Sequence, residues 1–413
     1  MGTSFEFQLV VPTVCVAVLG LFILVQVPIL RLKTGVYAIH ALIGIGAAVV
    51  ANGLLWRLWI QDGPRETAFG MVRVDGFGLF FSFLLLAITA LTVIASMRFL
   101  RTDEVDHGEF YALMMFCVAG MLVMMNTGHL IMILIGLEVF SVSMYVMTGM
   151  SRGRVRSVES ALKYFLMGAF SSGFLVYGMA LLYGSTGSLD LAEIGRYAAA
   201  GDPSKLFVAG IGLILVGLFF KIAVVPFHQW VPDVYTGAPT NVTGYMAAAT
   251  KTAAFAVLLR VLIGTFGTYA DGWIPLITVL SIVTMTVANL VALAQNNIKR
   301  MLAFSSIAHA GYLLIALVCL DGDGRSLGAG PILFYLTIYG LMTVGAFAVA
   351  AAVGRGDARG EDGYDLYSWA GLGTRRPMLG VAMAIFLLSL AGIPPTGGFF
   401  GKYAIFQAAI RSG

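Results

Sequence analysis

Several ionisable side chains lie inside apolar stretches of this 413-residue chain, where a charge is costly to bury. They are Glu138, Lys163, Lys221, Lys251, His309 and Lys402. A charge at the middle of a membrane-spanning helix costs about 2.5 to 3.5 kcal/mol, so idle charges are rare there. Any one of these residues could instead form a structural ion pair or extend its side chain to the membrane surface. Lys163, which follows Glu159 closely, and Lys402, near the end of the chain, are best placed for such an exit.

Buried amines and an imidazole are suited to handing on protons. Removal from water disfavours the charged form of a lysine, which brings proton release within reach of neutral pH. A nearby carboxylate such as Glu138 favours the charged lysine, so movement of either partner changes how tightly the proton is held. His309 can accept and donate a proton near physiological pH, although simple packing explains a single buried histidine equally well. The whole set predicts a proton relay.

Prolines interrupt two of these apolar stretches close to a lysine. Pro226 follows Lys221 by little more than one helical turn, and Pro394 and Pro395 shortly precede Lys402. Proline removes backbone hydrogen bonds, so each stretch should form a broken helix. Non-helical backbone at membrane depth is tolerated where it lines protein or a water-filled cavity. Paired interruptions of this kind point to a transporter built from inverted repeats, and two ordinary proline kinks are the alternative.

The composition indicates which elements must position these residues. Hydrophobic residues make up 59% of the chain and charged residues 11%, whereas roughly a quarter of an ordinary soluble domain is charged. This balance excludes a soluble enzyme, and the net charge of +4 gives no support for nucleic-acid binding. The 50 glycines and 12 prolines suit closely packed and broken membrane helices.

Apolar runs of about 20 residues predict membrane-spanning helices. The predicted spans are 8–30, 36–60, 75–97, 110–127, 129–150, 159–184, 206–227, 242–266, 273–294, 301–320, 331–353 and 378–410. Short loops join them, so we expect an all-α polytopic membrane protein. The longest loop, Gly354–Pro377, is rich in charged residues and should be solvated. The proline-rich run Pro226–Thr240 reads as an interfacial loop with Trp230 and Tyr235 as anchors.

The basic residues predict an orientation. Loops after odd-numbered spans carry Arg31, Lys33, Arg98, Arg101, Arg152, Arg154, Arg156, Lys299, Arg300, Arg355, Arg359, Arg375 and Arg376. Loops after even-numbered spans, with the helix ends included, carry Arg57, Arg65, Arg73, Arg196, Lys205, Arg260 and Arg325. The first group is the larger, which places the odd loops in the cytoplasm and the amino terminus outside.

Other chemistries find little support in the sequence. The cysteines Cys15, Cys117 and Cys319 lie far apart in apolar runs, which favours plain packing over a metal site or a disulfide. No cluster of His, Cys or carboxylate residues has metal-ligand spacing. The run Gly44–Val49 superficially begins like a dinucleotide fingerprint, but it lies inside an apolar span.

Longer motifs resemble a known family. Residues Pro226–Thr240 fit the pattern Pro-Phe-His-x-Trp-x-Pro-Asp-Val-Tyr-x-Gly-Ala-Pro-Thr, which is typical of the antiporter-like membrane subunits of NADH:quinone oxidoreductase, respiratory complex I. The Asp-Val-Tyr element favours the subunit N family over its sister subunits. Supporting matches are Gly136–Glu138, Ser160–Phe165, Ala249–Lys251, Asn297–Tyr312 and Leu390–Phe399.

The resemblance implies an antiporter-like fold with two inverted repeats and two broken helices. Residues 1–100 would hold the first three helices, 108–266 the first repeat with its break near Pro226, and 273–413 the second repeat with its break near Pro394. Relatives usually have fourteen helices where about twelve are predicted here, so we expect the second repeat to be truncated in this sequence. Many relatives carry Glu where Thr236 stands, a departure that affects nothing essential.

The resemblance also suggests a role for each buried charge. Glu138 and Lys221 would form the charge pair of the cytoplasmic half-channel, with Lys163 assisting. The list is completed by Lys251 as the connecting lysine, His309 on the central polar axis and Lys402 as the exit-side lysine.

The implied protein is a proton-translocating subunit without a redox centre, in a bacterial inner membrane. NADH, FMN, iron–sulfur clusters and quinone would bind to other subunits of the complex, and the partners would include the sister antiporter-like subunits and the lipid bilayer. A cation/proton antiporter subunit of the Mrp type is the alternative function. A purely structural membrane scaffold, in which the buried lysines are inert, is a further alternative.

Overall fold

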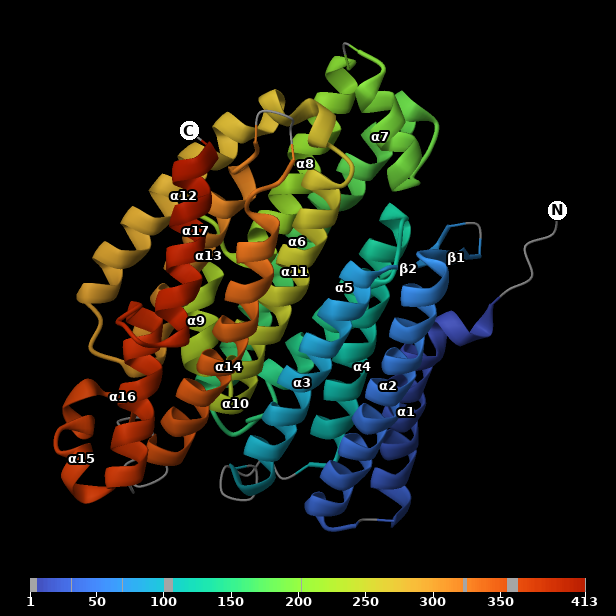
Figure 1. Ribbon diagram of the computed structural model, residues 1–413. Coiled ribbons are helices and arrows are strands. Elements are labelled where there is room, and N and C mark those ends of the chain that lie inside the picture. Colours follow the sequence, from blue (N-terminus) through green and yellow to red (C-terminus); the bar gives the residue numbers. More distant parts are fainter. Residues whose placement is uncertain are drawn as a thin grey trace.

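The computed structural model describes residues 6–30, 32–68, 70–99, 107–201, 203–321, 325–354 and 363–412. Long apolar helices form one bundle in which most axes run side by side (Figure 1). The α-helices are α1 (Val11–Leu30), α2 (Thr34–Asp62), α3 (Gly76–Phe99), α4 (Glu109–Met125), α5 (Leu130–Thr148), α6 (Val155–Thr186), α7 (Leu191–Ala199), α8 (Lys205–Ile222), α9 (Trp230–Gly237), α10 (Thr240–Tyr245), α11 (Lys251–Leu258), α12 (Ala270–Leu293), α13 (Ile298–Val318), α14 (Ala329–Gly354), α15 (Leu372–Arg375), α16 (Pro377–Ala391) and α17 (Gly397–Ser412). Short 3-10 turns lie at Phe7–Val10, Gly267–Tyr269 and Leu366–Trp369.

The predicted spans match these helices. Within the described residues, 10 helical runs are long and apolar enough to cross a membrane, and α4 and α16 are shorter apolar helices. Each predicted span has its counterpart among them, so the expectation of a polytopic helical membrane protein with about twelve helices is confirmed. The last predicted span differs in detail, because α16 and α17 divide it into two shorter helices.

Both predicted helix breaks are present. Helix α8 ends at Ile222, Ala223 takes a left-handed conformation with a φ of 62°, and α9 begins at Trp230. Helix α16 ends at Ala391 and α17 begins at Gly397. The prolines lie inside these gaps because they can neither donate a backbone hydrogen bond nor fit the preceding turn of a helix.

The helix that carries Lys251 lies in the centre of the bundle. It runs from α10 through a π-helical stretch, η2 (Met246–Thr250), into α11 and then a second π-helical stretch, η3 (Leu259–Ile263). Of its most apolar window, 89% is buried inside the protein, against 22% for α12. A charge on this central helix is therefore surrounded by protein on all sides, whereas a charge on α12 would face the periphery.

Glycines allow the closest helix contacts. A Cβ atom added at Gly178 on α6 would lie 2.8 Å from the Gly210 carbonyl oxygen on α8, and one added at Gly120 on α4 would lie 2.6 Å from the Gly136 carbonyl oxygen on α5. Without a hydrophobic force to drive helices together in lipid, such backbone proximity supplies the packing contacts. The high glycine content is used here for helix packing.

Two small elements depart from the all-helical expectation. Strands β1 (Arg65–Thr67) and β2 (Val72–Val74) form an antiparallel hairpin between α2 and α3, and α7 is a short helix outside the spans. Figure 1 places both at the same end of the bundle. The strands are too short for an alternating pattern to reveal them in the sequence.

Some charged loops fall outside the described residues. The charged residues concerned are Arg31, Arg101 and, in the long predicted loop, Arg355, Asp357, Arg359, Glu361 and Asp362. The side chain of Arg98 is also not among the described parts of the chain. The described remainder of the long loop contains α15, where the Arg375 guanidinium donates to the carbonyl oxygens of Ser368 and Ala370 at 2.8 and 2.7 Å. These contacts are exposed, which agrees with a solvated loop.

Candidate functional site: a buried polar file

Lys221 lies in a cage of aromatic rings. It occupies the last turn of α8 with 3% of its surface exposed. Its Nζ atom donates to Ser141 Oγ on α5 at 2.8 Å and lies 3.5 Å from the Tyr145 hydroxyl. The rings of Phe140, Tyr145, Tyr164 and Phe220 have their centroids between 5.3 and 5.9 Å from Nζ. Ring faces and two hydroxyls therefore take the place of water around this ammonium group.

Glu138 belongs to the same region but does not contact Lys221. Within the described residues, no ion pair of 4 Å or less joins the two; instead Ser172 on α6 donates a hydrogen bond to Glu138. Ser141, which binds Lys221, lies one turn beyond Glu138 on α5. The Lys221 amine is thus bound by a hydroxyl that lies one turn from Glu138 on α5.

Lys163 reaches the protein surface and forms ion pairs there. Its Nζ atom lies 2.7 Å from Glu159 and 3.1 Å from Asp233, with 44% of the side chain exposed. Helix α6 has 32 residues, more than a bilayer requires, and Lys163 lies near its first residues. This lysine therefore belongs to a surface ion cluster and not to the buried site of Lys221.

Lys251 is held by Ser306. It is 2% exposed at the start of α11, and its Nζ atom donates to both the carbonyl oxygen and the hydroxyl of Ser306, the latter at 2.7 Å. The Tyr339 hydroxyl on α14 donates to the same Ser306 hydroxyl at 2.8 Å. Ser306 therefore joins the central lysine to a group of tyrosines.

His309 lies within that tyrosine group. It follows Ser306 by one turn on α13, is 2% exposed and shares a hydrogen bond with the Tyr335 hydroxyl. The centroids of the Tyr312, Tyr335 and Tyr339 rings lie 5.5, 5.8 and 5.2 Å from that of its imidazole. His309 thus lies in the buried interior and has a hydrogen-bond partner there.

Lys402 lies at the second break. Its Nζ atom donates to the carbonyl oxygens of Leu390 and Ala391 at 2.9 and 3.1 Å, so it caps the end of α16 from the neighbouring α17. It also lies 4.7 Å from the centroid of the Tyr312 ring, which packs on His309. Lys251, Ser306, His309 and Lys402 are therefore linked into one file, with Tyr339 between Ser306 and His309 and Tyr312 between His309 and Lys402. We call this file the polar file.

The first and second halves of the site are not joined directly. Lys221 contacts Ser141 and Tyr145, whereas Lys251 contacts Ser306, although α8 and α11 pack against each other. A proton that passes from one lysine to the other needs water or a side-chain movement to bridge this step.

A further buried lysine was missed by the sequence reasoning. Lys299 was counted as a cytoplasmic loop residue, but it is 2% exposed and donates to the carbonyl oxygens of Thr236 and Ala238 at 2.9 and 2.7 Å. It also lies 5.1 Å from the centroid of the Tyr364 ring. The preceding Asn297 caps α13, which places Lys299 in its first turn. That capping asparagine was the signal available in the sequence.

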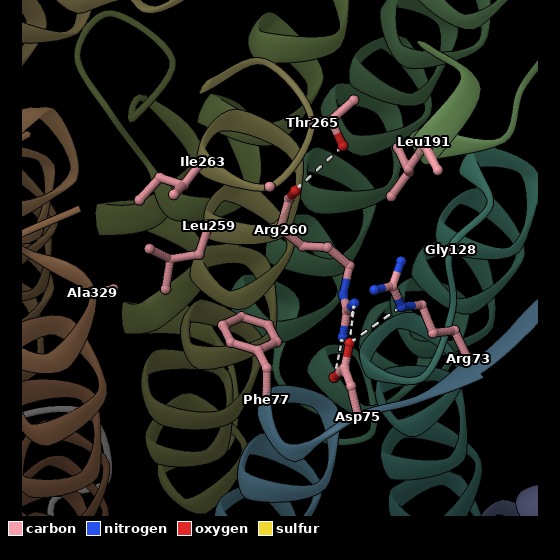
Figure 2. Close-up of a pocket in the computed structure, with 12 residues that line it drawn as sticks. Arg73, Asp75, Phe77, Gly128, Leu191, Leu259, Arg260, Ile263, Thr265 and Ala329 are labelled. Carbon is pink, nitrogen blue, oxygen red and sulfur yellow. Dashed lines mark hydrogen bonds and ion pairs between the residues drawn. The ribbon is translucent and has the colours of Figure 1, made fainter. Parts of the chain in front are cut away.

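A buried arginine was missed as well. Arg260 on η3 forms a two-pronged ion pair with Asp75, at 2.8 and 3.0 Å, and donates to the Met125 carbonyl oxygen at 2.9 Å. Figure 2 shows both residues beside Arg73 in a pocket of about 330 Å³. Burial raises the pKa of Asp75. The hydrogen bonds and charge of Arg260, together with the Gly78 N–H, have the larger opposite effect, so the pKa lies below its ordinary value. Arg260 interrupts an apolar run, and the criterion that selected the lysines would have selected it.

The described residues offer no group of three or more His, Cys, Asp or Glu side chains that could hold a metal ion. The three cysteines are free thiols, of which Cys117 and Cys319 are buried.

A bundle with two broken helices, each with a lysine beside its break, defines an antiporter-like membrane protein. Residues 127–413 match the family described as "NADH:quinone oxidoreductase/Mrp antiporter, TM". "NADH-quinone oxidoreductase subunit N" of Trichlorobacter lovleyi is 42% identical over 99% of this chain and 82% of that relative. "NADH-quinone oxidoreductase subunit N 1" of Sorangium cellulosum is 46% identical over 82% of this chain and 68% of its own length. The chain belongs to the subunit N family of NADH-quinone oxidoreductases.

Solved structures agree with this family. The structure "Respiratory complex I from Thermus thermophilus with bound Aureothin" contains a chain that is 36% identical, with a TM-score of 0.78 over 97% of this chain and 83% of that one. The structure "Structure of Mrp complex from Dietzia sp. DQ12-45-1b" contains a chain with a TM-score of 0.83 over 99% of this chain and 76% of that one. At 24% identity, the second likeness concerns the fold alone. The family and the antiporter-like fold expected from the motifs are thus confirmed.

Proposed function

We propose that this chain is a proton-translocating membrane subunit of NADH:quinone oxidoreductase. Quinone reduction elsewhere in the complex would drive protons through it. The observation that carries this proposal is the polar file, in which the buried residues Lys251, Ser306 and His309 are followed by the partly buried Lys402. Such a set is costly to bury and has no evident purpose in a passive helix bundle.

The proposed route begins on the cytoplasmic side at Lys221. A proton passes from there to Lys251, through Ser306 and His309 to Lys402, and then to the outside. Glu138 controls the first step, because its charge lies one turn from the Ser141 hydroxyl that holds Lys221. Lys163 assists from the surface cluster at the cytoplasmic end.

We also propose that the two breaks belong to inverted repeats over residues 108–266 and 273–413, after three helices within 1–100. The pairing of α8 and α9 with α16 and α17 supports this division, since a lysine lies beside each break. The chain would span a bacterial inner membrane several times. Its amino terminus would lie outside, because the loops after odd-numbered spans carry more basic residues and would face the cytoplasm.

The chain itself would carry no redox centre. NADH, FMN, iron–sulfur clusters and quinone would bind in other subunits, and the chain would assemble with its sister antiporter-like subunits. A cation/proton antiporter of the Mrp type receives less support, because the two relatives compared by sequence above carry the name of the oxidoreductase and the Mrp likeness concerns the fold.

The test is a Lys221→Ala variant in the assembled complex. Inverted membrane vesicles would be supplied with NADH, and proton uptake and quinone reduction would be measured together. We expect Lys221→Ala to abolish most proton uptake while electron transfer to an artificial acceptor shows that the complex is assembled. Lys205→Ala is the matched control, since Lys205 is an exposed lysine at the other end of the same helix. Undiminished proton uptake in Lys221→Ala would remove the proposed role of this lysine.

A further inference from the structure

The short helix α9 is held by ionic contacts from two sides. It follows the first break and packs against both α6 and α13. A pocket of about 320 Å³ lies at this contact and is lined by Arg156, Glu159, Ser160, Lys163, Asp233, Thr236, Gly237 and Arg300. The charges meet at one residue of α9, Asp233.

Asp233 binds a cation from each neighbouring helix. Its Oδ2 atom lies 3.1 Å from Lys163 Nζ on α6, and its Oδ1 atom lies 2.9 Å from the Arg300 guanidinium on α13. The Ser160 hydroxyl on α6 donates to its backbone carbonyl oxygen at 3.1 Å. Two cations at this distance keep a carboxylate ionised, so Asp233 is poorly suited to carry a proton itself. Its contacts are suited to fixing a position.

The other end of α9 is fixed from α13 as well. Lys299, the neighbour of Arg300, donates to the carbonyl oxygens of Thr236 and Ala238, where α9 ends. The first turn of α13 therefore binds α9 at two places: Arg300 at the Asp233 carboxylate and Lys299 at the carboxyl end of the helix. A cation at that end also suits the helix dipole.

Helix α9 in turn forms part of the wall around Lys221. Its first residue, Trp230, stacks on Tyr164 with ring centroids 4.7 Å apart and donates from its indole to the Phe220 carbonyl oxygen at 3.0 Å. Tyr164 directly follows Lys163 in the chain, and its ring centroid lies 5.9 Å from Lys221 Nζ. A shift of α9 would therefore alter the aromatic cage.

Helices α6 and α13, which bind α9, also provide the hydrogen-bond partners of Glu138 and Lys251. Ser172 on α6 binds Glu138, and Ser306 on α13 binds Lys251. We propose that Asp233 is a positioning residue: by joining α6 to α13 through α9, it aligns the Lys221 cage with the Lys251 end of the polar file. This inference rests on the proposed proton route and assigns a role to a residue outside it.

The experiment compares Asp233→Asn with Glu159→Gln in the assembled complex. Glu159 also binds Lys163, but it lies on α6 itself, so its loss leaves every contact of α9 in place. The side chains of Asp233, Lys163 and Arg300 are 39% to 44% exposed. Exposed pairs contribute little to stability, so Asp233→Asn should assemble normally. Electron transfer to an artificial acceptor checks that assembly.

We expect Asp233→Asn to lower proton uptake by roughly three- to tenfold, which corresponds to about 0.7 to 1.4 kcal/mol at the barrier. Glu159→Gln should retain the wild-type rate, and Asp233→Glu should recover most of it. Arg300→Gln combined with Asp233→Asn should cost no more than Asp233→Asn alone, because both remove one contact. The pH dependence of uptake should keep its shape in Asp233→Asn.

Wild-type uptake in Asp233→Asn would overturn the inference, as would an equal loss in Glu159→Gln. A shifted pH profile in Asp233→Asn would make this residue a proton carrier and would also overturn it. Lys221→Ala separates the two ideas: if Lys221→Ala loses uptake and Asp233→Asn does not, the proposed function stands and the positioning role fails.

Discussion

Ser306 offers the sharpest test of the polar file, because a single hydroxyl joins its parts. Lys251 Nζ and the Tyr339 hydroxyl both donate to Ser306 Oγ, at 2.7 and 2.8 Å, and Ser306 is 2% exposed. In Ser306→Ala, Lys251 keeps the backbone carbonyl oxygen of residue 306 but loses the hydroxyl. The Tyr339 hydroxyl loses its partner at the same time. The link from the central lysine to the tyrosine group is then cut without removal of any titratable group.

The size of the effect follows from these two contacts. A hydrogen bond that involves a charged group contributes about 1.5 to 3 kcal/mol, and a buried donor left without a partner costs about 1 to 3 kcal/mol. Water entering the space of the hydroxyl would recover part of this. A net loss of about 1.4 kcal/mol at the barrier corresponds to a tenfold slower transfer. We therefore expect Ser306→Ala to slow proton uptake by about tenfold.

The assay is NADH-driven proton uptake by inverted vesicles, with electron transfer to an artificial acceptor as the measure of assembly. Ser306→Thr keeps a hydroxyl and should retain most of the uptake. Ser305→Ala makes the same chemical change at the neighbouring residue, which is only partly buried, and should behave like wild type. If Ser306→Ala pumps at the wild-type rate, or if Ser305→Ala is equally impaired, the file does not depend on this hydroxyl and the reasoning is refuted.

Two further predictions concern the central helix. Lys251→Met should abolish most proton uptake, whereas a passive scaffold would tolerate it without loss; uptake by the same vesicles decides between them. Asp75→Asn should leave Arg260 without its charged partner and destabilise the protein by about 3 kcal/mol at neutral pH, measured as a lower temperature of thermal unfolding in detergent. Because the pKa of folded Asp75 lies below its ordinary value, the stability it provides is present above the unfolded pKa of 3.8 and disappears as the pH falls through the folded pKa. The difference between wild type and Asp75→Asn should therefore shrink below about pH 4, and a constant difference would contradict the assignment.

The spans and breaks could be predicted because each has a strong signal. An apolar run long enough to cross a bilayer has few alternatives, and proline cannot continue a helix. Burial of Lys221, Lys251 and His309 followed from the same reasoning, since each lies well inside such a run. These features depend on composition along the chain and not on which helix faces which.

The contacts between helices could not be predicted in the same way. Most of these helices are apolar on all sides, so no periodic pattern indicates which face is turned inward. Glu138 and Lys221 were expected to pair, whereas in the structure the Lys221 amine donates to Ser141 and Ser172 donates to Glu138. Lys299 and Arg260 were counted with the loops and helix ends, although capping and an ion pair with a distant residue bury them.

The two breaks use different groups to hold the free end of a helix, and this difference has a mechanical consequence. At the first break the neutral indole of Trp230 donates to the Phe220 carbonyl oxygen, whereas at the second the Lys402 amine donates to the carbonyl oxygens of Leu390 and Ala391. A positive charge is stabilised at the carboxyl end of a helix, so protonation of Lys402 and closure of α17 on α16 support each other. Linkage then requires that any movement separating these helices also promotes release of the proton from Lys402. No such coupling acts through Trp230, because an indole does not titrate. A movement of helices at the two breaks would therefore affect a titratable group directly only at the second one, through Lys402.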